Sequence, residues 1–233
     1  MKPSSLLRND DGDGVAVCAA ELLGSMLASS LAERGRAHFA LSGGTTPAGT
    51  YRALTLASWD GVEVWFADER CVGPDDPESN YLMVGQTLLD HAPGALVHRI
   101  EGELGAERAA SAYETLLRER VADELPVLDV VVLGIGEDGH TASLFPNFPQ
   151  LRAAGAACLA VHDSPKPPPD RVTLSLEVLN AARAIVLLAS GTGKADALAR
   201  ALGAPDLAVP ASLLAGERLT VIADAAALAL AGA

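Results

Sequence analysis

The chain has 233 residues and a net charge of −13, from 17 lysines and arginines against 30 aspartates and glutamates. The excess of acids argues against nucleic acid and anionic membranes as main partners, because both select basic surfaces. An anionic substrate therefore needs a local cluster of cations that works against the overall charge. The three separated cysteines fit neither a zinc site nor a disulfide framework, and we expect reduced thiols in a cytoplasmic protein.

Residues 1–14 are polar and acidic, and they lack the apolar stretch of a signal peptide. We assign them to a polar N-terminal segment that precedes one domain of residues 15–233. No apolar run reaches the roughly 20 residues of a membrane span. Residues 15–34 predict a helix, because alanine and leucine recur every four positions and Gly35 follows. The apolar run 37–41 predicts a buried strand.

Strands and helices alternate along the rest of the chain. Thr46 is the expected N-cap of a helix that starts at Pro47. Several strands are apolar on both faces, which is typical of a parallel sheet covered by helices on both sides. We predict an α/β fold with a single doubly wound domain, a mostly parallel sheet and helices on both faces. The further strands are 62–67, 128–134, 158–163, 171–176, 184–190 and 218–224, and the further helices 79–90, 107–124, 193–202 and 224–231.

Ligands of open parallel sheets bind beyond the carboxyl ends of the strands, and the first such loop here is LSGGTTP, residues 41–47. Gly43 and Gly44 permit a sharp turn and close approach of a ligand to the backbone. The amides of the turn and of the next helix point toward one spot, which predicts a phosphate site. The spacing is not that of a nucleotide P-loop, and an ordinary strand-to-helix turn is the alternative.

Two further strand ends carry charged residues. Asp68, Glu69 and Arg70 directly follow an apolar run, and the planar guanidinium of Arg70 suits a phosphate. A solvated loop with a local ion pair is the alternative. Ser-Gly-Thr-Gly at 190–193 opens a helix with Lys194 in its first turn, where a cation is favoured only if an anion lies beside it. Arg171 is a candidate cation at the same rim, or a surface residue of its strand.

The segment 133–146, LGIGEDGHTASLFP, follows an apolar strand and is rich in glycine. It matches a dinucleotide fingerprint, but Glu137 and Asp138 would repel a pyrophosphate in that turn. The glycines instead favour the display of His140 as a candidate general base, against a structural role for a lone histidine. We do not expect Asp138 to reach the same imidazole from an extended turn.

These motifs together resemble the glucosamine-6-phosphate isomerase/6-phosphogluconolactonase family from about residue 15 to the C-terminus. The segments that carry the resemblance are LSGGTTP, WFADERCV with DPESNY, LGIGEDGHTASLFP, RVTLSL and SGTGKADAL, in this order. It implies a modified Rossmann-like fold similar to that of the glucosamine-6-phosphate deaminases. It also implies a carboxylic ester hydrolase that converts 6-phospho-D-glucono-1,5-lactone to 6-phospho-D-gluconate in the pentose phosphate pathway, with neither metal nor organic cofactor.

The resemblance assigns roles to individual residues. His140 matches the catalytic histidine, and we place Asp138 with it. Arg171 matches a basic position ahead of a strand. The positions matching phosphate contacts are Gly43, Gly44, Arg70 and Lys194, and we add Thr45 and Asp68 to the substrate-binding residues.

Two other activities compete with lactone hydrolysis. The deaminases of the family carry a Glu five residues after the catalytic histidine, where this chain has Phe145, which cannot relay a proton. A non-catalytic sugar-phosphate sensor would have no need of His140 and usually carries a DNA-binding segment. We therefore expect a small phosphorylated sugar lactone as the partner, no nucleic acid, no membrane, no metal, and a monomer or weak homodimer.

Overall fold

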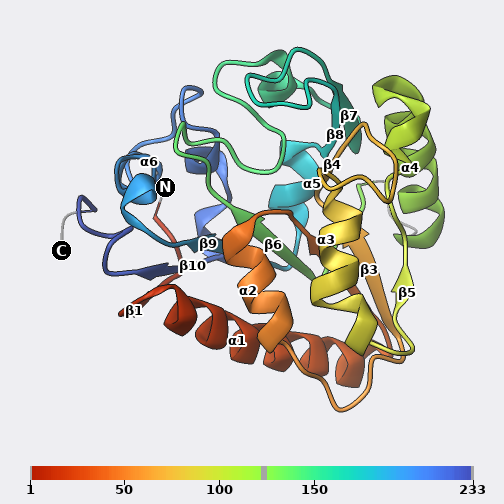
Figure 1. Ribbon diagram of the computed structural model, residues 1–233, viewed down its shortest axis with the longest axis horizontal. Coiled ribbons are helices and arrows are strands. Elements are labelled where there is room, and N and C mark those ends of the chain that lie inside the picture. Colours follow the sequence, from red (N-terminus) through yellow and green to blue (C-terminus); the bar gives the residue numbers. More distant parts are fainter. Residues whose placement is uncertain (1, 122–124, 232–233) are drawn as a thin grey trace.

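A computed structural model describes residues 2–121 and 125–231 of the chain. Within these residues, seven parallel strands form one sheet in the order β1-β10-β9-β6-β2-β3-β5 (Figure 1). The mostly parallel α/β fold predicted from the sequence is confirmed. The strands are β1 (Ser5–Asn9), β2 (Ala37–Leu41), β3 (Val62–Phe66), β5 (Leu96–Val97), β6 (Val130–Gly134), β9 (Ala184–Ala189) and β10 (Leu219–Asp224).

The order in which the chain fills the sheet reverses once. The chain passes from the edge strand β1 to β2, β3 and the other edge strand β5, and then returns through β6, β9 and β10. The first three helices of the chain pack against one another in chain order, and the first two contact strands of this sheet (Figure 1). Right-handed connections predict that the helices before and after the reversal cover opposite faces. The helices are α1 (Gly12–Arg34), α2 (Thr45–Ala53), α3 (Asn80–Thr87), α4 (Ala106–Val121), α5 (Leu176–Ala181) and α6 (Ala195–Ala201). Short 3₁₀ helices are η1 (Leu89–His91), η2 (Gly102–Leu104), η3 (Pro149–Arg152), η4 (Thr192–Lys194), η5 (Pro210–Leu213) and η6 (Gly216–Arg218).

Helix α1 has well-defined ends and packs along the sheet. The Asp11 side chain accepts a hydrogen bond from Gly14 N, and Gly35 ends the helix with a φ of 70°. By length and composition alone, this helix is apolar enough to cross a membrane. Its apolar side is occupied within the fold, because Val15, Leu23 and Leu27 are fully buried in the core against the strands.

A second, smaller sheet lies beside the carboxyl ends of the main strands. It consists of β4 (Asp68–Arg70), β8 (Arg171–Leu174) and β7 (Cys158–Val161), all antiparallel, in the order β4-β8-β7. The sequence pattern led us to expect the last two as members of the parallel sheet and the Asp68–Arg70 segment as a loop. Both expectations were wrong, because three short strands pair with one another outside the main sheet.

Several element bounds also differ from the prediction. Within the polar segment 1–14, Ser5–Asn9 form the edge strand β1, and α1 already starts at Gly12. The division of the chain at residue 15 stays a prediction. The expected helix 224–231 is a series of turns, and the last three residues of the expected helix 107–124 lie outside the described residues. Helix α2 starts at Thr45 with Gly44 as its N-cap, which replaces the predicted Thr46 cap.

The reversal of chain direction creates a crevice between two neighbouring strands. Strands β2 and β6 are adjacent, but the chain leaves β2 toward β3 and leaves β6 toward β9. The loops that follow them therefore diverge and leave an opening at their carboxyl ends. The predicted glycine turn and the predicted histidine loop meet at this point.

Candidate active site

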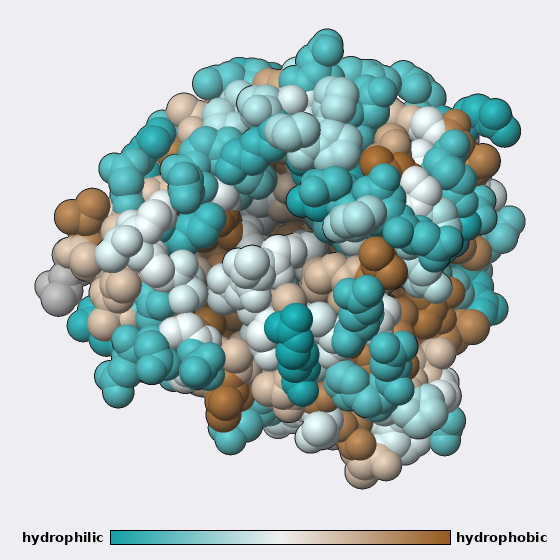
Figure 2. Space-filling model, viewed as in Figure 1, coloured by the Kyte–Doolittle hydropathy of each residue, from teal (hydrophilic) through white to brown (hydrophobic). Residues whose placement is uncertain are grey.

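The loops at this crevice surround a cavity of about 310 Å³. Figure 2 shows the corresponding hollow near the centre of the face, bordered mainly by hydrophilic and near-neutral side chains. A volume of this size is at the small end of ligand sites. The sequence-predicted residues that line it are Gly43, Gly44, Thr45, Asp68, Arg70, His140, Arg171 and Lys194.

The Tyr51 side chain holds the glycine turn after β2 in place. The Tyr51 hydroxyl donates to Ser42 O at 2.9 Å and accepts from Ser42 N at 3.1 Å. A Cβ at Gly43 would overlap Asn80 Oδ1, so only glycine fits beside the amide that Asn80 places there. The start of α2 faces the cavity, and the buried Ser42 Oγ has no hydrogen-bond partner within the described residues. Such amides and an unpaired hydroxyl suit an anion.

His140 is paired with Asp138 behind the cavity. Nδ1 of His140 lies 2.5 Å from Asp138 Oδ1, which corrects our expectation that this carboxylate would not reach the ring. The turn folds back on itself, because Gly136 N donates to His140 O at 2.8 Å. A Cβ at Gly136 would overlap both His140 Nδ1 and Asp138 Oδ1. Glycine at this position is therefore a condition for the pair.

The charge state of the pair follows from its surroundings. Burial opposes ionisation of Asp138, but the hydrogen bond and charge of His140 outweigh it and lower the pKa of the carboxyl to about 2. An ionised Asp138 accepts a hydrogen bond from the N–H group at Nδ1. Nε2 of a neutral His140 is then the nitrogen that is free to take a proton, and the ring lines the cavity. The arrangement is that of an oriented general base.

Phe145 packs against this histidine. It is fully buried, and its ring centroid lies 4.9 Å from that of His140. Phe145 also contacts Arg171, whose guanidinium carbon lies 5.6 Å from the Phe145 ring centroid. Phe145 is therefore an apolar support for the imidazole.

Antiparallel pairing brings two predicted cations together, because Arg70 of β4 is directly opposite Arg171 of β8. Arg70 Nη1 contacts both Glu78 O at 2.6 Å and Glu78 Oε2 at 3.1 Å, while its buried Nε has no partner within the described residues. Lys194 ends η4 beside the same cavity, and burial lowers the pKa of its amine. Arg70, Arg171 and Lys194 thus line the same cavity as the glycine turn.

The acids of β4 serve different purposes. Asp68 is buried and lines the cavity. It accepts a hydrogen bond from Ser143 Oγ at 2.6 Å, which holds the loop that follows His140. Glu69 accepts from the backbone N–H groups of Asn80 at 2.8 Å and Tyr81 at 2.7 Å, which fixes the start of α3. Burial raises the pKa of Glu69 despite these hydrogen bonds.

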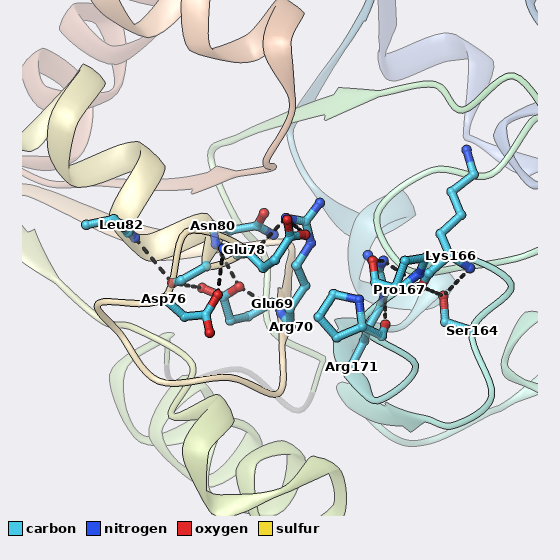
Figure 3. A network of polar contacts seen from close by, with 12 residues as sticks. Glu69, Arg70, Asp76, Glu78, Asn80, Leu82, Ser164, Lys166, Pro167 and Arg171 are labelled. Carbon is cyan, nitrogen blue, oxygen red and sulfur yellow. Dashed lines mark hydrogen bonds and ion pairs between the residues drawn. The ribbon is translucent and has the colours of Figure 1, made fainter.

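The polar residues Ser42, Asn80 and Lys166 belong to the cavity wall and were not singled out from the sequence. Lys166 lies in the proline-rich stretch 164–170, which we interpreted only as a stiff loop. In Figure 3, the Lys166 side chain extends away from the backbone contacts that this loop makes with Ser164 and Arg171. The sequence signal that could have identified Lys166 is a lysine within a proline-rich loop that leads into Arg171.

No group of three or more His, Cys, Asp or Glu side chains is placed to hold a metal ion in residues 2–121 and 125–231. The two candidate acids of the site are engaged elsewhere, Asp138 with His140 and Asp68 with Ser143. We therefore assign these carboxylates to orienting roles.

Comparison with known proteins agrees with this geometry. Residues 10–222 match the family described as glucosamine-6-phosphate isomerases/6-phosphogluconolactonase. The chain belongs to this family. It is 38% identical to a 6-phosphogluconolactonase of Mycobacterium leprae over 225 residues, 91% of each chain. It is 42% identical to the human 6-phosphogluconolactonase over 202 residues, 77% of each chain.

Solved structures of the family share the fold over nearly the whole length. The 6-phosphogluconolactonase of Trypanosoma brucei superposes with a TM-score of 0.87 at 26% identity and 97% coverage of each chain. A monomeric glucosamine-6-phosphate deaminase gives a TM-score of 0.79 at 22% identity and covers 97% of this chain, which shows a shared fold alone. The fold thus serves both activities, and the residues of the cavity must distinguish them.

Proposed function

We propose that this chain hydrolyses 6-phospho-D-glucono-1,5-lactone to 6-phospho-D-gluconate in the pentose phosphate pathway, as a carboxylic ester hydrolase. The observation that carries the proposal is the His140–Asp138 pair, whose imidazole lines a cavity that also presents cations and helix-terminal amides. One end of that cavity suits a phosphate, and the other suits proton transfer at a carbonyl. The named relatives support the same activity.

The phosphate end is formed by Gly43, Gly44, Thr45, Arg70 and Lys194, with Arg171 beside them. Backbone amides at the start of α2 donate to phosphate oxygens, and the helix dipole favours their negative charge. The Arg70 and Lys194 side chains add charge-assisted hydrogen bonds. This local cluster offsets the net charge of −13.

At the lactone end, neutral His140 accepts a proton at Nε2 from a water that attacks the carbonyl carbon. The attack forms a tetrahedral oxyanion, which backbone amides of a glycine-rich turn stabilise. Protonated His140 then returns its proton to the ring oxygen as the C–O bond breaks, leaving a carboxylic acid and a hydroxyl. The acid then loses its proton to solvent and becomes the carboxylate of 6-phospho-D-gluconate. Asp138 keeps Nδ1 protonated and stabilises the imidazolium during the step.

Phe145 distinguishes lactone hydrolysis from sugar deamination. Opening an aminosugar ring needs a group that relays a proton, and a buried phenyl ring offers none. A lactone is already an activated acyl group and needs no such step. We therefore propose a lactonase and expect no release of ammonia from glucosamine 6-phosphate.

The test is a rate measurement on freshly generated lactone, with a no-enzyme control because the lactone opens spontaneously. We expect the protein to accelerate hydrolysis far above that control and to release no ammonia from glucosamine 6-phosphate. Ammonia release without lactonase activity would replace the proposal with the deaminase reaction. We further propose that the protein is cytoplasmic and that it is a monomer or weak homodimer. Sedimentation at two concentrations tests the oligomeric state.

A further inference from the structure

His162 follows β7 on the outside of the cavity and lies between two carboxylates from different elements. Its Nδ1 is 2.7 Å from Oδ1 of Asp170, just ahead of β8, and its Nε2 is 2.5 Å from Oε1 of Glu107, in the first turn of α4. An ionised carboxylate only accepts hydrogen bonds, and a neutral imidazole has one N–H. Both contacts together therefore require the imidazolium form of His162.

Residues 163–170, which we call the strap, connect His162 to Arg171 and are tied internally. Ser164 N donates to Pro169 O at 2.9 Å, and Ser164 Oγ donates to Lys166 O at 2.8 Å. The Arg171 guanidinium donates to the carbonyls of Lys166 at 3.0 Å and Pro167 at 3.1 Å (Figure 3). These contacts make the strap a unit, so a displacement of its base is transmitted to its tip.

The tip of the strap reaches the cavity, while its base is fixed outside it. Lys166 and Pro167 line the cavity wall. At the base, Asp170 O accepts from Cys71 N at 3.0 Å, and the Asp170 carboxylate contacts His162. The contact from His162 to Glu107 is a polar link from this base to helix α4, in addition to the packing of α4 against β7 and β8.

We propose that His162 is a positioning residue, whose imidazolium joins the base of the strap to α4 and thereby sets the place of Lys166 at the cavity. The proposal rests on the lactonase activity proposed above. Lys166 supplies a cation for the anionic end of the substrate. His140 belongs to a different loop, so loss of the His162 link weakens substrate binding and leaves the chemical step nearly unchanged.

The link depends on pH in a defined direction. Hydrogen bonds that His162 donates to Asp170 and then to Glu107 raise the pKa of the imidazole, so the link is complete below that pKa and is lost as pH rises through it. The titratable groups that face it are Glu107 from α4 and Asp170 from the strap. Behind Asp170 lies the Cys71 thiol, whose pKa burial raises to about 11, with contributions from Asp170 and Glu107.

The experiment compares His162→Gln with the native protein by KM and kcat on freshly generated lactone across neutral and alkaline pH. Glutamine cannot donate to both carboxylates, and exposed ion pairs contribute modestly, so we expect KM to rise about two- to fivefold with kcat nearly unchanged. Native KM should rise with pH toward the variant's value, while the variant's KM lacks that rise. Glu107→Gln, which breaks the same link from the other side, should reproduce the effect.

Three further variants separate positioning from general destabilisation. His162→Arg keeps a positive donor and should restore most of the native KM, and His91→Gln, at an exposed histidine of η1, is the matched control. In a Lys166→Ala background, His162→Gln should add no further change, because the responding group is gone. An unchanged KM in both His162→Gln and Glu107→Gln, or an equal KM effect without Lys166, would overturn the proposal.

Calorimetry measures the affinity of the same variants for 6-phosphogluconate, and this shows the effect of the His162 link on binding independently of catalysis. If native protein shows no lactonase activity, the proposed function fails, and this affinity still decides the role of His162. If native protein is active but neither KM nor affinity responds to His162→Gln, the positioning role alone is refuted.

Discussion

Gly136→Ala tests the geometry of the His140–Asp138 pair with a single methyl group. The added Cβ would overlap Nδ1 of His140 and Oδ1 of Asp138, so the imidazole must move by more than about 1 Å for the methyl to fit. Gly136 carries no left-handed φ, and the effect is therefore one of space and not of backbone strain.

The expected loss follows from that displacement. A misplacement of about 1 Å in a catalytic group costs on the order of 10²-fold in rate, which corresponds to about 2.7 kcal/mol in the activation free energy. The phosphate end lies on other loops, so KM should change little. The assay is the steady-state rate on freshly generated lactone, corrected for spontaneous opening, with thermal unfolding recorded in parallel.

Gly85→Ala is the matched control, because Gly85 lies within α3 and an added Cβ has no neighbour within 4 Å. This substitution should keep native activity and stabilise the helix by roughly 0.5–1 kcal/mol. If Gly136→Ala retains more than a third of native kcat while folding normally, the contact between His140 and Asp138 is not needed for turnover.

Three further predictions concern binding, metals and pH. Arg70→Ala should lower kcat/KM on the phosphorylated lactone about tenfold or more and barely affect unphosphorylated gluconolactone, with exposed Arg52→Ala unchanged on both; equal losses on the two substrates would refute the phosphate assignment. Activity should survive exhaustive EDTA treatment, and loss that Zn²⁺ or Mn²⁺ restores would contradict the roles given to Asp68 and Asp138. Burial lowers the pKa of His38 and His98, so below about pH 6.5 the unfolded chain binds more protons and stability falls as pH drops from 7 to 5; urea unfolding that is flat over this range would be the contrary result.

The main sheet was predictable because its central strands are continuous apolar runs between helical patterns. Strands β2, β6 and β9 follow that signal, since both of their faces are covered. Strand β4, by contrast, is the three-residue segment Asp68–Arg70, and β5 has two residues. Both strands are too short to show an alternation of apolar and polar residues in the sequence. Their existence depends on partners far along the chain.

Local hydrogen bonds explain the helix that was predicted but not formed after β10. The Asp224 side chain accepts from Ala227 N at 2.7 Å and from Gly191 N at 2.9 Å. It thereby fixes a turn and ties it to the loop after β9. The alanine-rich composition of this segment favours a helix, but these side-chain contacts favour turns.

The site was predictable where charge and glycine coincide at strand ends, as at Gly43 and Lys194. The direct contact of Asp138 with His140 was missed, because it depends on a turn folded back by the bond from Gly136 N to His140 O. Lys166 was missed for a similar reason, since the path of the strap places it at the cavity. Residue type indicated the chemistry, and loop conformation decided which groups meet.

His140→Ala tests the central claim most directly, by kcat on freshly generated 6-phosphogluconolactone beside calorimetric affinity for 6-phosphogluconate. A general base contributes about 10²–10⁴-fold, so kcat should fall by that factor. Product affinity should remain near native, because the anion site is formed by other loops. A variant that keeps more than about a third of native kcat, where a hundredfold loss is expected, would show that the base lies elsewhere.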